Sequence, residues 1–191
     1  SNSYAPVHVR GANGVGLRGN IDANAATNYT DLDIRNDGTV WEWGNNDYGE
    51  VGDGTMASRS LPVQVLGVGG AGTLSGVKQV SGGGNQFLAL LNDNTVVAWG
   101  ENYVGDLGQG VSGEAYNSPF PLQVKDSSGT GYLSGIAEVE AGGLSSFAIA
   151  SNGTLWAWGW NGYGQLGDGT MIDHTLPVAS LAQVSQPRTC S

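Results

Sequence analysis

The sequence of 191 residues has few basic side chains, one cysteine and no long apolar run. Lysine and arginine together number 7 against 17 acidic residues, which gives a formal net charge of −10 at neutral pH. Binding to nucleic acid or to an anionic membrane surface needs a basic surface that neutralises phosphates. The charge therefore argues against both as partners.

The single cysteine, Cys190, excludes a disulfide within the chain, and its place near the last residue favours an unused thiol over a cross-link between chains. No apolar run approaches the length of about 18 residues that spans a bilayer, so we expect no membrane insertion. Scarce lysine, abundant Gly, Asn, Ser and Thr, and negative charge are typical of exported bacterial proteins. We therefore expect an extracellular or cell-surface location, with a signal peptide that is not present in this sequence.

Patterns for catalysis and metal binding are also missing. The two histidines, His8 and His174, come from loops that are not equivalent, and no serine elbow, phosphate loop or paired-carboxylate pattern stands out. The stretch "DLDIRNDG" at residues 31–38 is superficially similar to a calcium loop, but Arg35 occupies a ligand position and no bidentate glutamate follows. We expect no enzyme activity, no catalytic residue, no metal site and no cofactor.

One aromatic and glycine-rich stretch occurs three times. "WAWGWNGYGQLGDGT" at residues 156–170 corresponds to "WEWGNNDYGEVGDGT" at 41–55 and to "VAWGENYVGDLGQG" at 97–110. The shared frame W-G-x-N-x-x-G-x-(V/L)-G is anchored by Trp43, Trp99 and Trp158, which are 56 and 59 residues apart. A binding site usually occurs once, whereas a structural unit that cannot bury its own apolar face is stacked in copies. The stretch therefore indicates a repeated scaffold.

A second marker, a proline followed by an apolar residue, sets the boundaries of the units. It occurs at Pro6, Pro62, Pro121 and Pro177. The boundaries predict repeats at 6–61, 62–120 with an insertion at 111–120, and 121–176, and the start of an incomplete fourth repeat at 177–191.

Each unit is predicted to form about four short antiparallel strands. The proline segment is expected to be the first strand, because the missing N–H is tolerated at a strand start. Segments such as "FLALL" and "TVVAWG" supply later strands, and "NDG" at 36–38 and "SNG" at 151–153 are hairpin signals. No stretch of a dozen residues has helical apolar spacing. The sequence therefore predicts an all-β fold of three β-propeller-type blades, a partial or oligomer-completed propeller.

The third unit, "VEAGGLSSFAIASNGTLWAWGWNGYGQLGDGT" at residues 139–170, resembles the regulator of chromosome condensation repeats. The resemblance extends in phase over three units and implies propeller blades. The nucleotide-exchange activity known in that family depends on a ring of seven blades, so we do not expect it of three units without a comparable basic surface. Thr30, Gln86 and Ser145 replace the histidine of the family pattern.

Most of the repeated aromatic and amide residues are interpreted as scaffold. Trp43, Trp99 and Trp158 recur at one strand position and are expected to pack between blades. Trp160 has polar counterparts in the other copies, so a contact role and a local cover for the turn are equally open. The predicted contact residues for a partner are Trp160, Tyr48, Tyr103, Tyr116, Tyr163 and Glu114.

Two functional hypotheses follow from the open arc of three units. In the first, a non-enzymatic extracellular module assembles into a ring or a filament, with the surplus strand at Pro177, Val178 and Leu181 donated to a neighbouring copy. In the second, a monomeric propeller recognises another protein, in the manner of an inhibitor, or a glycan, through the loops that carry the predicted contact residues. The expected partner is thus a second copy of the chain or another protein.

Overall fold

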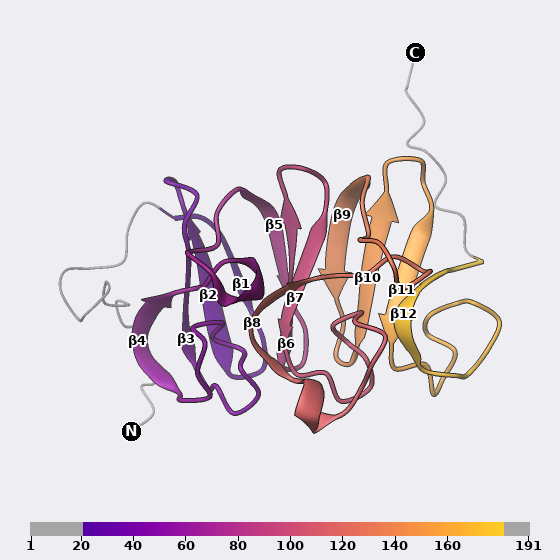
Figure 1. Ribbon diagram of the computed structural model, residues 1–191, viewed down its shortest axis with the longest axis horizontal. Coiled ribbons are helices and arrows are strands. Elements are labelled where there is room, and N and C mark those ends of the chain that lie inside the picture. The colour runs from indigo at the N-terminus through magenta and orange to yellow at the C-terminus, as the bar shows by residue number, and fades with distance from the viewer. Residues whose placement is uncertain (1–20, 182–191) are drawn as a thin grey trace, which may run out of the picture.

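The computed structural model describes residues 21–181 as three four-stranded antiparallel sheets that stand side by side (Figure 1). The first blade contains β1 (Ile21–Ala26), β2 (Thr30–Arg35), β3 (Val40–Gly44) and β4 (Arg59–Gln64). The second contains β5 (Val77–Gly82), β6 (Gln86–Leu91), β7 (Val96–Gly100) and β8 (Ser118–Gln123). The third contains β9 (Ile136–Ala141), β10 (Ser145–Ala150), β11 (Leu155–Gly159) and β12 (His174–Ala179). Two short 3-10 helices, η2 (Val68–Gly70) and η3 (Glu114–Tyr116), lie in loops. The prediction of an all-β fold with three propeller-type blades is confirmed.

The proline segments are the last strands of their sheets, and the predicted strand order within each unit is wrong in this respect. Pro62, Pro121 and Pro177 lie in β4, β8 and β12, each of which is the fourth strand of a sheet. A proline cannot donate to a ladder and is tolerated at an edge strand, so an outermost strand accommodates it as well as a strand start does. The blades therefore extend over 21–64, 77–123 and 136–179. Pro6 and Cys190 lie outside the described residues.

The prediction of a surplus donor strand is wrong for the same reason. Val178 in β12 pairs with Ala157 in β11, and the sheet order is β12-β11-β10-β9. Leu181 follows β12, and its N–H donates to the Gly167 carbonyl oxygen of the same blade at 2.8 Å. The Pro177 strand completes the third blade and is not free for donation.

The predicted hairpin turns are confirmed between the second and third strands of each blade. Gly38 and Gly153 have φ values of +78° and +88°, which glycine adopts without the clash of a Cβ atom. In the second blade Asn94 takes the corresponding role at φ +64°, as asparagine tolerates this region better than most residues do.

Alternate residues of each strand pack against different neighbouring blades. Phe87 and Ala89 of β6 join the apolar core between the first and second blades, while Leu88 and Leu90 join the core between the second and third. This is the period-two alternation of a strand that is buried on both faces. The face of a blade toward the next blade in the sequence is termed its leading face, and the opposite face its trailing face.

The repeated tryptophans link the blades, as their scaffold interpretation predicts. The Trp99 Nε1–H donates to the Glu50 carbonyl oxygen at 2.9 Å, and the Trp158 Nε1–H donates to the Asp106 carbonyl oxygen at 2.8 Å. Both indoles are fully buried. Trp43 occupies the same register position in the first blade and is half-buried.

Candidate interaction surfaces

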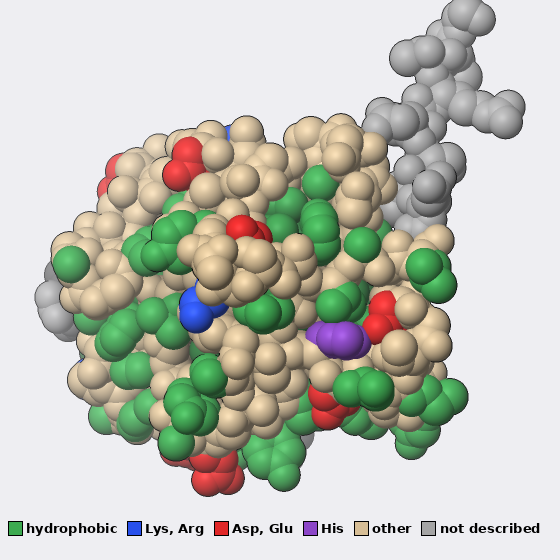
Figure 2. Space-filling view, turned by 45° about the vertical axis from the view of Figure 1, so that its right-hand side comes forward, with side chains coloured by type: hydrophobic (Ala, Val, Ile, Leu, Met, Phe, Trp, Pro, Cys, Tyr) green, Lys and Arg blue, Asp and Glu red, His purple; other side chains and the backbone are tan. Residues whose placement is uncertain are grey.

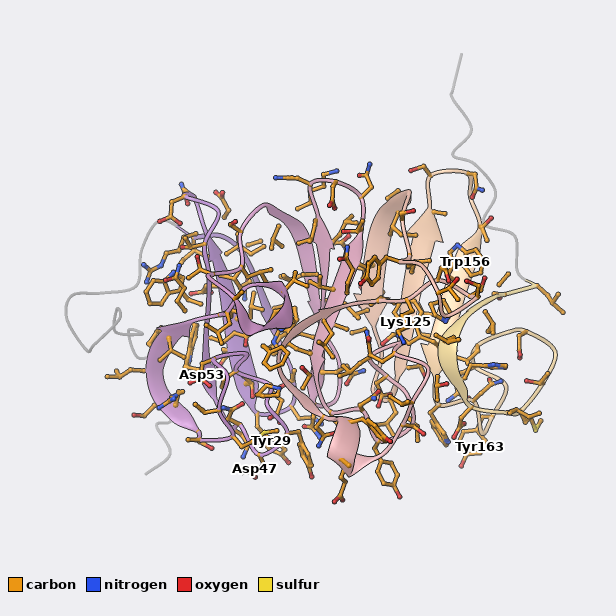
Figure 3. All side chains as sticks on the ribbon, viewed as in Figure 1. Tyr29, Asp47, Asp53, Lys125, Trp156 and Tyr163 are labelled. Carbon is orange, nitrogen blue, oxygen red and sulfur yellow. The ribbon has the colours of Figure 1, made fainter. Side chains whose placement is uncertain are left out.

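Three long loops and three short turns lie at the same end of the blades. The loops join the third and fourth strands and the turns join the first and second strands: 45–58, 101–117 and 160–173 are the loops, and 27–29, 83–85 and 142–144 are the turns. In each blade the first loop residue donates its N–H to the carbonyl oxygen of the last turn residue: Asn45 to Tyr29 (3.0 Å), Glu101 to Asn85 (3.0 Å) and Trp160 to Leu144 (2.8 Å). This end of the molecule is termed the loop rim, and Figure 3 shows Tyr29, Asp47 and Tyr163 along it.

Each long loop is organised by one buried asparagine, as the repeated frame predicts. In the third blade, Asn161 accepts a hydrogen bond from the Leu166 N–H at 3.0 Å. Its Nδ2 group donates to the carbonyl oxygens of Thr170 (3.2 Å) and Ile172 (3.1 Å). Asn46 and Asn102 hold their loops in the same way, and all three are fully buried. The rim is therefore a fixed surface rather than a set of loose loops.

The predicted contact residues all lie on the loop rim, although their binding role stays a prediction. Tyr103, Tyr116 and Tyr163 are exposed, as is Glu114 at the start of η3, while Tyr48 is half-buried. Trp160 is also half-buried, and its ring packs edge-on against the ring of Tyr163 with a centroid distance of 5.1 Å. Sequence reasoning missed Tyr29, which is 73% exposed. The signal in the sequence was its position, because Tyr29 lies in the short turn that corresponds to the turns with glycine pairs in the other two units.

The loops and turns of the rim contain acidic but no basic residues, and two of their carboxylates lie against basic side chains of the adjoining strands. Arg59 forms an ion pair with Asp53, and the His174 Nε2 atom lies 2.8 Å from Asp168 Oδ2. The Thr170 N–H and hydroxyl, His174 and Asn161 hold the pKa of Asp168 at about 2. Asp168 is thus a side-chain acceptor within the turn that "GDGT" forms.

The leading face of the third blade carries no further blade within residues 21–181. Phe147, Ile149 and Leu155 are half-buried there, whereas their counterparts in the second blade, Leu88, Leu90 and Val96, are at most 2% exposed. A groove of about 530 Å³ lies where this face meets the loop rim. Its lining includes Leu144, Phe147, Trp160, Tyr163 and Gln165.

Buried carboxyl groups are a feature that the sequence did not reveal. Burial raises the pKa of Asp106 to about 7 and raises the pKa of Glu50, which has the same position in the first loop. Burial also raises the pKa of Glu42 well above its ordinary range, although the Trp99 indole N–H donates to this carboxyl at 3.2 Å. Gln165 has the position of Glu50 and Asp106 in the third loop and is neutral. The sequence showed only that every unit has a polar residue between two glycines at this position, and it did not show the burial.

The described part of the chain brings together no three His, Cys, Asp or Glu side chains that could hold a metal ion. None of its helices has the length and apolar character needed to cross a membrane.

Comparison with known proteins identifies the repeats. A family model for the "Regulator of chromosome condensation (RCC1) repeat" matches residues 37–90 and 152–188, and a second model of the same description matches residues 77–106 and 136–165. The chain is 33% identical over 144 residues to "Protein RCC2 homolog" of Danio rerio, covering 74% of this chain and 27% of the relative. It is 30% identical over 138 residues to "Ultraviolet-B receptor UVR8" of Arabidopsis thaliana, covering 72% of this chain and 29% of the relative.

Solved structures support the fold. Human WBSCR16 superposes with a TM-score of 0.68 at 24% identity, over 83% of this chain and 37% of that protein. Prp20p of Saccharomyces cerevisiae, which was studied for its binding to Gsp1p and histones, superposes with a TM-score of 0.70 at 21% identity, over 86% of this chain and 39% of that protein. The chain thus spans well under half the length of these relatives.

Proposed function

Because the chain belongs to the RCC1 repeat family, we propose that it is a non-enzymatic protein-interaction module that associates with a second copy of itself through the leading face of the third blade. The binding of Prp20p to other proteins supports a protein partner. The observation that carries the proposal is a set of backbone groups on this face that no other group within residues 21–181 pairs, at the positions where the two internal blade interfaces form hydrogen bonds.

The two internal interfaces repeat the same three hydrogen bonds. An indole N–H of the following blade donates to a loop carbonyl oxygen of the preceding blade, that of Glu50 or Asp106. A loop glycine N–H of the preceding blade donates to the outermost strand of the following blade: Gly54 to the Pro119 carbonyl oxygen and Gly110 to that of Thr175, both at 2.8 Å. An N–H in the short turn between the first and second strands donates to the same turn of the following blade: Asn28 to the Gly84 carbonyl oxygen (3.1 Å) and Gly84 to that of Gly143 (2.9 Å).

The third blade carries the same three groups on its leading face. They are the Gln165 carbonyl oxygen, the Gly169 N–H and the Gly143 N–H, and across residues 21–181 no hydrogen bond is formed by any of them. Around them lie the half-buried side chains of Phe147 and Ile149. A docked blade would pair these backbone groups and remove the apolar side chains from water, as it does at both internal interfaces.

The first blade of a second copy would present its trailing face, on which Trp43 has the same register position as Trp99. This face differs in charge from that of the second blade, because Asp31 and Asp33 replace Phe87 and Ala89. We therefore expect an association that is weaker than the internal contacts and that depends on concentration. This head-to-tail contact produces a ring if the rotation closes and a filament if it does not.

Hydrogen exchange of single amides tests the proposal with controls inside the same molecule. The Gly169 amide is expected to exchange more slowly as the protein concentration rises, because the docked outer strand accepts its hydrogen bond. Gly54 and Gly110 make this bond within one chain, so their amides are expected to be protected at every concentration. Exchange at Gly169 that stays fast at all concentrations would contradict the association.

We also propose that the module acts outside the cell or at its surface. The composition supports this location through its scarce lysine and its abundant small polar residues. Fractionation of the producing cells tests it, and recovery of the protein in the cytosolic fraction would contradict it.

A further inference from the structure

Exposed large apolar side chains gather at the loop rim. Eight of them belong to its turns and loops: Tyr29, Met56, Tyr103, Val111, Tyr116, Tyr163, Met171 and Ile172. Figure 2 shows hydrophobic and acidic side chains together along the lower margin of the molecule. Single exposed apolar residues are ordinary, but a set shared by three successive loops indicates a surface that another molecule covers.

The third blade is specifically apolar at a rim position where the second blade is polar. In the second blade the Asn85 Nδ2 group donates to Glu101 Oε2 at 2.9 Å. The register places Leu144 and Trp160 at these two positions in the third blade. Because the same loop folds with a polar pair in the second blade, the fold itself does not require the apolar pair. Together with the edge-on ring of Tyr163, this pair provides an anchor for an apolar side chain of a partner.

The negative charge of the rim favours a partner with basic side chains. Exposed carboxyl groups are contributed by Asp47, Glu114 and Asp173. The loops and turns of the rim contain no lysine, arginine or histidine. Arg59 and His174, the first residues of β4 and β12, adjoin the rim and lie against its carboxylates Asp53 and Asp168. A cationic partner would therefore meet carboxylates and tyrosine ring faces, and both attract lysine and arginine.

We propose that the loop rim binds an extended segment of another protein in which lysine or arginine alternates with apolar residues. The apolar residues contact the Leu144, Trp160 and Tyr163 anchor, and the basic residues contact the carboxylates and the exposed tyrosines. The anchor shares one groove with Phe147 of the third blade's leading face, so a second copy docked on that face would compete with the peptide. Peptide binding is therefore measured at protein concentrations at which the chain is monomeric.

Fluorescence anisotropy with a labelled peptide of alternating lysine and leucine tests the proposal. The peptide is expected to bind with an affinity that falls as salt rises, whereas a matched glutamate and leucine peptide is not expected to bind. The Y103A/Y163A variant is expected to bind at least about tenfold more weakly, a loss of about 1.4 kcal/mol. The control is Tyr132→Ala, which removes a tyrosine that is 60% exposed in the loop between β8 and β9, at the opposite end of the blades.

The charge and the anchor are tested separately. D47N/E114Q is expected to weaken binding and to reduce its salt dependence, whereas E138Q/E140Q, which removes two exposed carboxylates from β9, is expected to leave binding unchanged. L144N/W160Q installs an amide pair at the positions where the second blade holds Asn85 and Glu101, and it is expected to weaken binding while the circular dichroism spectrum stays native.

The proposal would be overturned if the lysine and leucine peptide did not bind, if the glutamate and leucine peptide bound equally well, or if the affinity were unchanged in Y103A/Y163A. Binding of a neutral oligosaccharide at the rim in place of the basic peptide would also overturn it, in favour of a glycan partner.

Discussion

Replacement of Asp106 by asparagine should stabilise the protein in a strongly pH-dependent way. Asp106 is fully buried between the second and third blades, and the Oδ1 atom has no hydrogen-bond partner in the structure. Its Oδ2 atom accepts a long hydrogen bond from the Val104 N–H, at 3.5 Å. The third loop shows that a neutral amide fits this position, because Gln165 Oε1 accepts the Tyr163 N–H at 3.0 Å.

The expected magnitude follows from the pKa of Asp106, which burial raises from an ordinary value of 3.8 to about 7. Between these two values the folded protein binds more protons than the unfolded chain, so its stability falls as the pH rises and the cost is complete above the folded pKa. At about 1.4 kcal/mol for each pH unit, the charged carboxylate costs on the order of 4 kcal/mol at pH 8 and little at pH 4. Asp106→Asn removes the charge, so its stabilising effect should grow by on the order of 4 kcal/mol from pH 4 to pH 8.

Urea unfolding of both proteins, followed by tryptophan fluorescence at several pH values, measures this effect. Glu42 and Glu50, whose pKa values are also raised by burial, titrate in both proteins, so the difference in the free energy of unfolding isolates Asp106. A difference that is the same at pH 4 and pH 8 would refute the reasoning. A destabilisation that increases with pH would refute it more strongly.

Three further substitutions test the scaffold. Asn161→Ala removes the buried amide that holds the third loop, and urea unfolding should show a loss of about 3 kcal/mol; a loss below about 1 kcal/mol would show that the loop is held by other contacts. Trp158→Phe deletes the indole donor to Asp106 and leaves a cavity, with an expected loss of about 3 kcal/mol in the same assay; an unchanged midpoint would contradict the linking role of the indole. Gly105→Ala should lower the melting temperature more than Gly164→Ala does. The Cβ added at Gly105 would lie 2.7 Å from the Thr175 Cα of the next blade, whereas the atom nearest to a Cβ at Gly164 is 3.6 Å away. Equal losses in thermal melts would count against this steric argument.

The repeated frame was sufficient to predict the blades from sequence. Trp99 recurs as Trp158 because the indole reaches the preceding blade, and Asn161 recurs in every unit because the amide holds its own loop. A local pattern therefore carries the information on packing. The place of Pro177 within its sheet could not be predicted, because a missing N–H is compatible with either end of a blade. Only the pairing of β12 with β11 decides between them.

The functional surfaces were predictable only in part. Tyr103 and Tyr163 could be assigned to the rim because they lie within the repeated loop. The apolar anchor could not, since Leu144 and Trp160 are far apart in sequence and meet only through the pairing of β10 with β11. The raised pKa of Asp106 was equally hidden, because it depends on burial between two blades rather than on neighbours in the sequence.

The most direct test of the central claim is the mass of the protein by light scattering over a series of concentrations. Blade docking between copies predicts a mass that rises from 19.6 kDa, that of one chain, toward multiples of it. Ile149→Arg, which places a charge on the leading face of the third blade, should hold the mass at 19.6 kDa. Val68→Arg, at an exposed site in η2, should leave the association intact. A constant 19.6 kDa for the natural sequence at every concentration would contradict the claim.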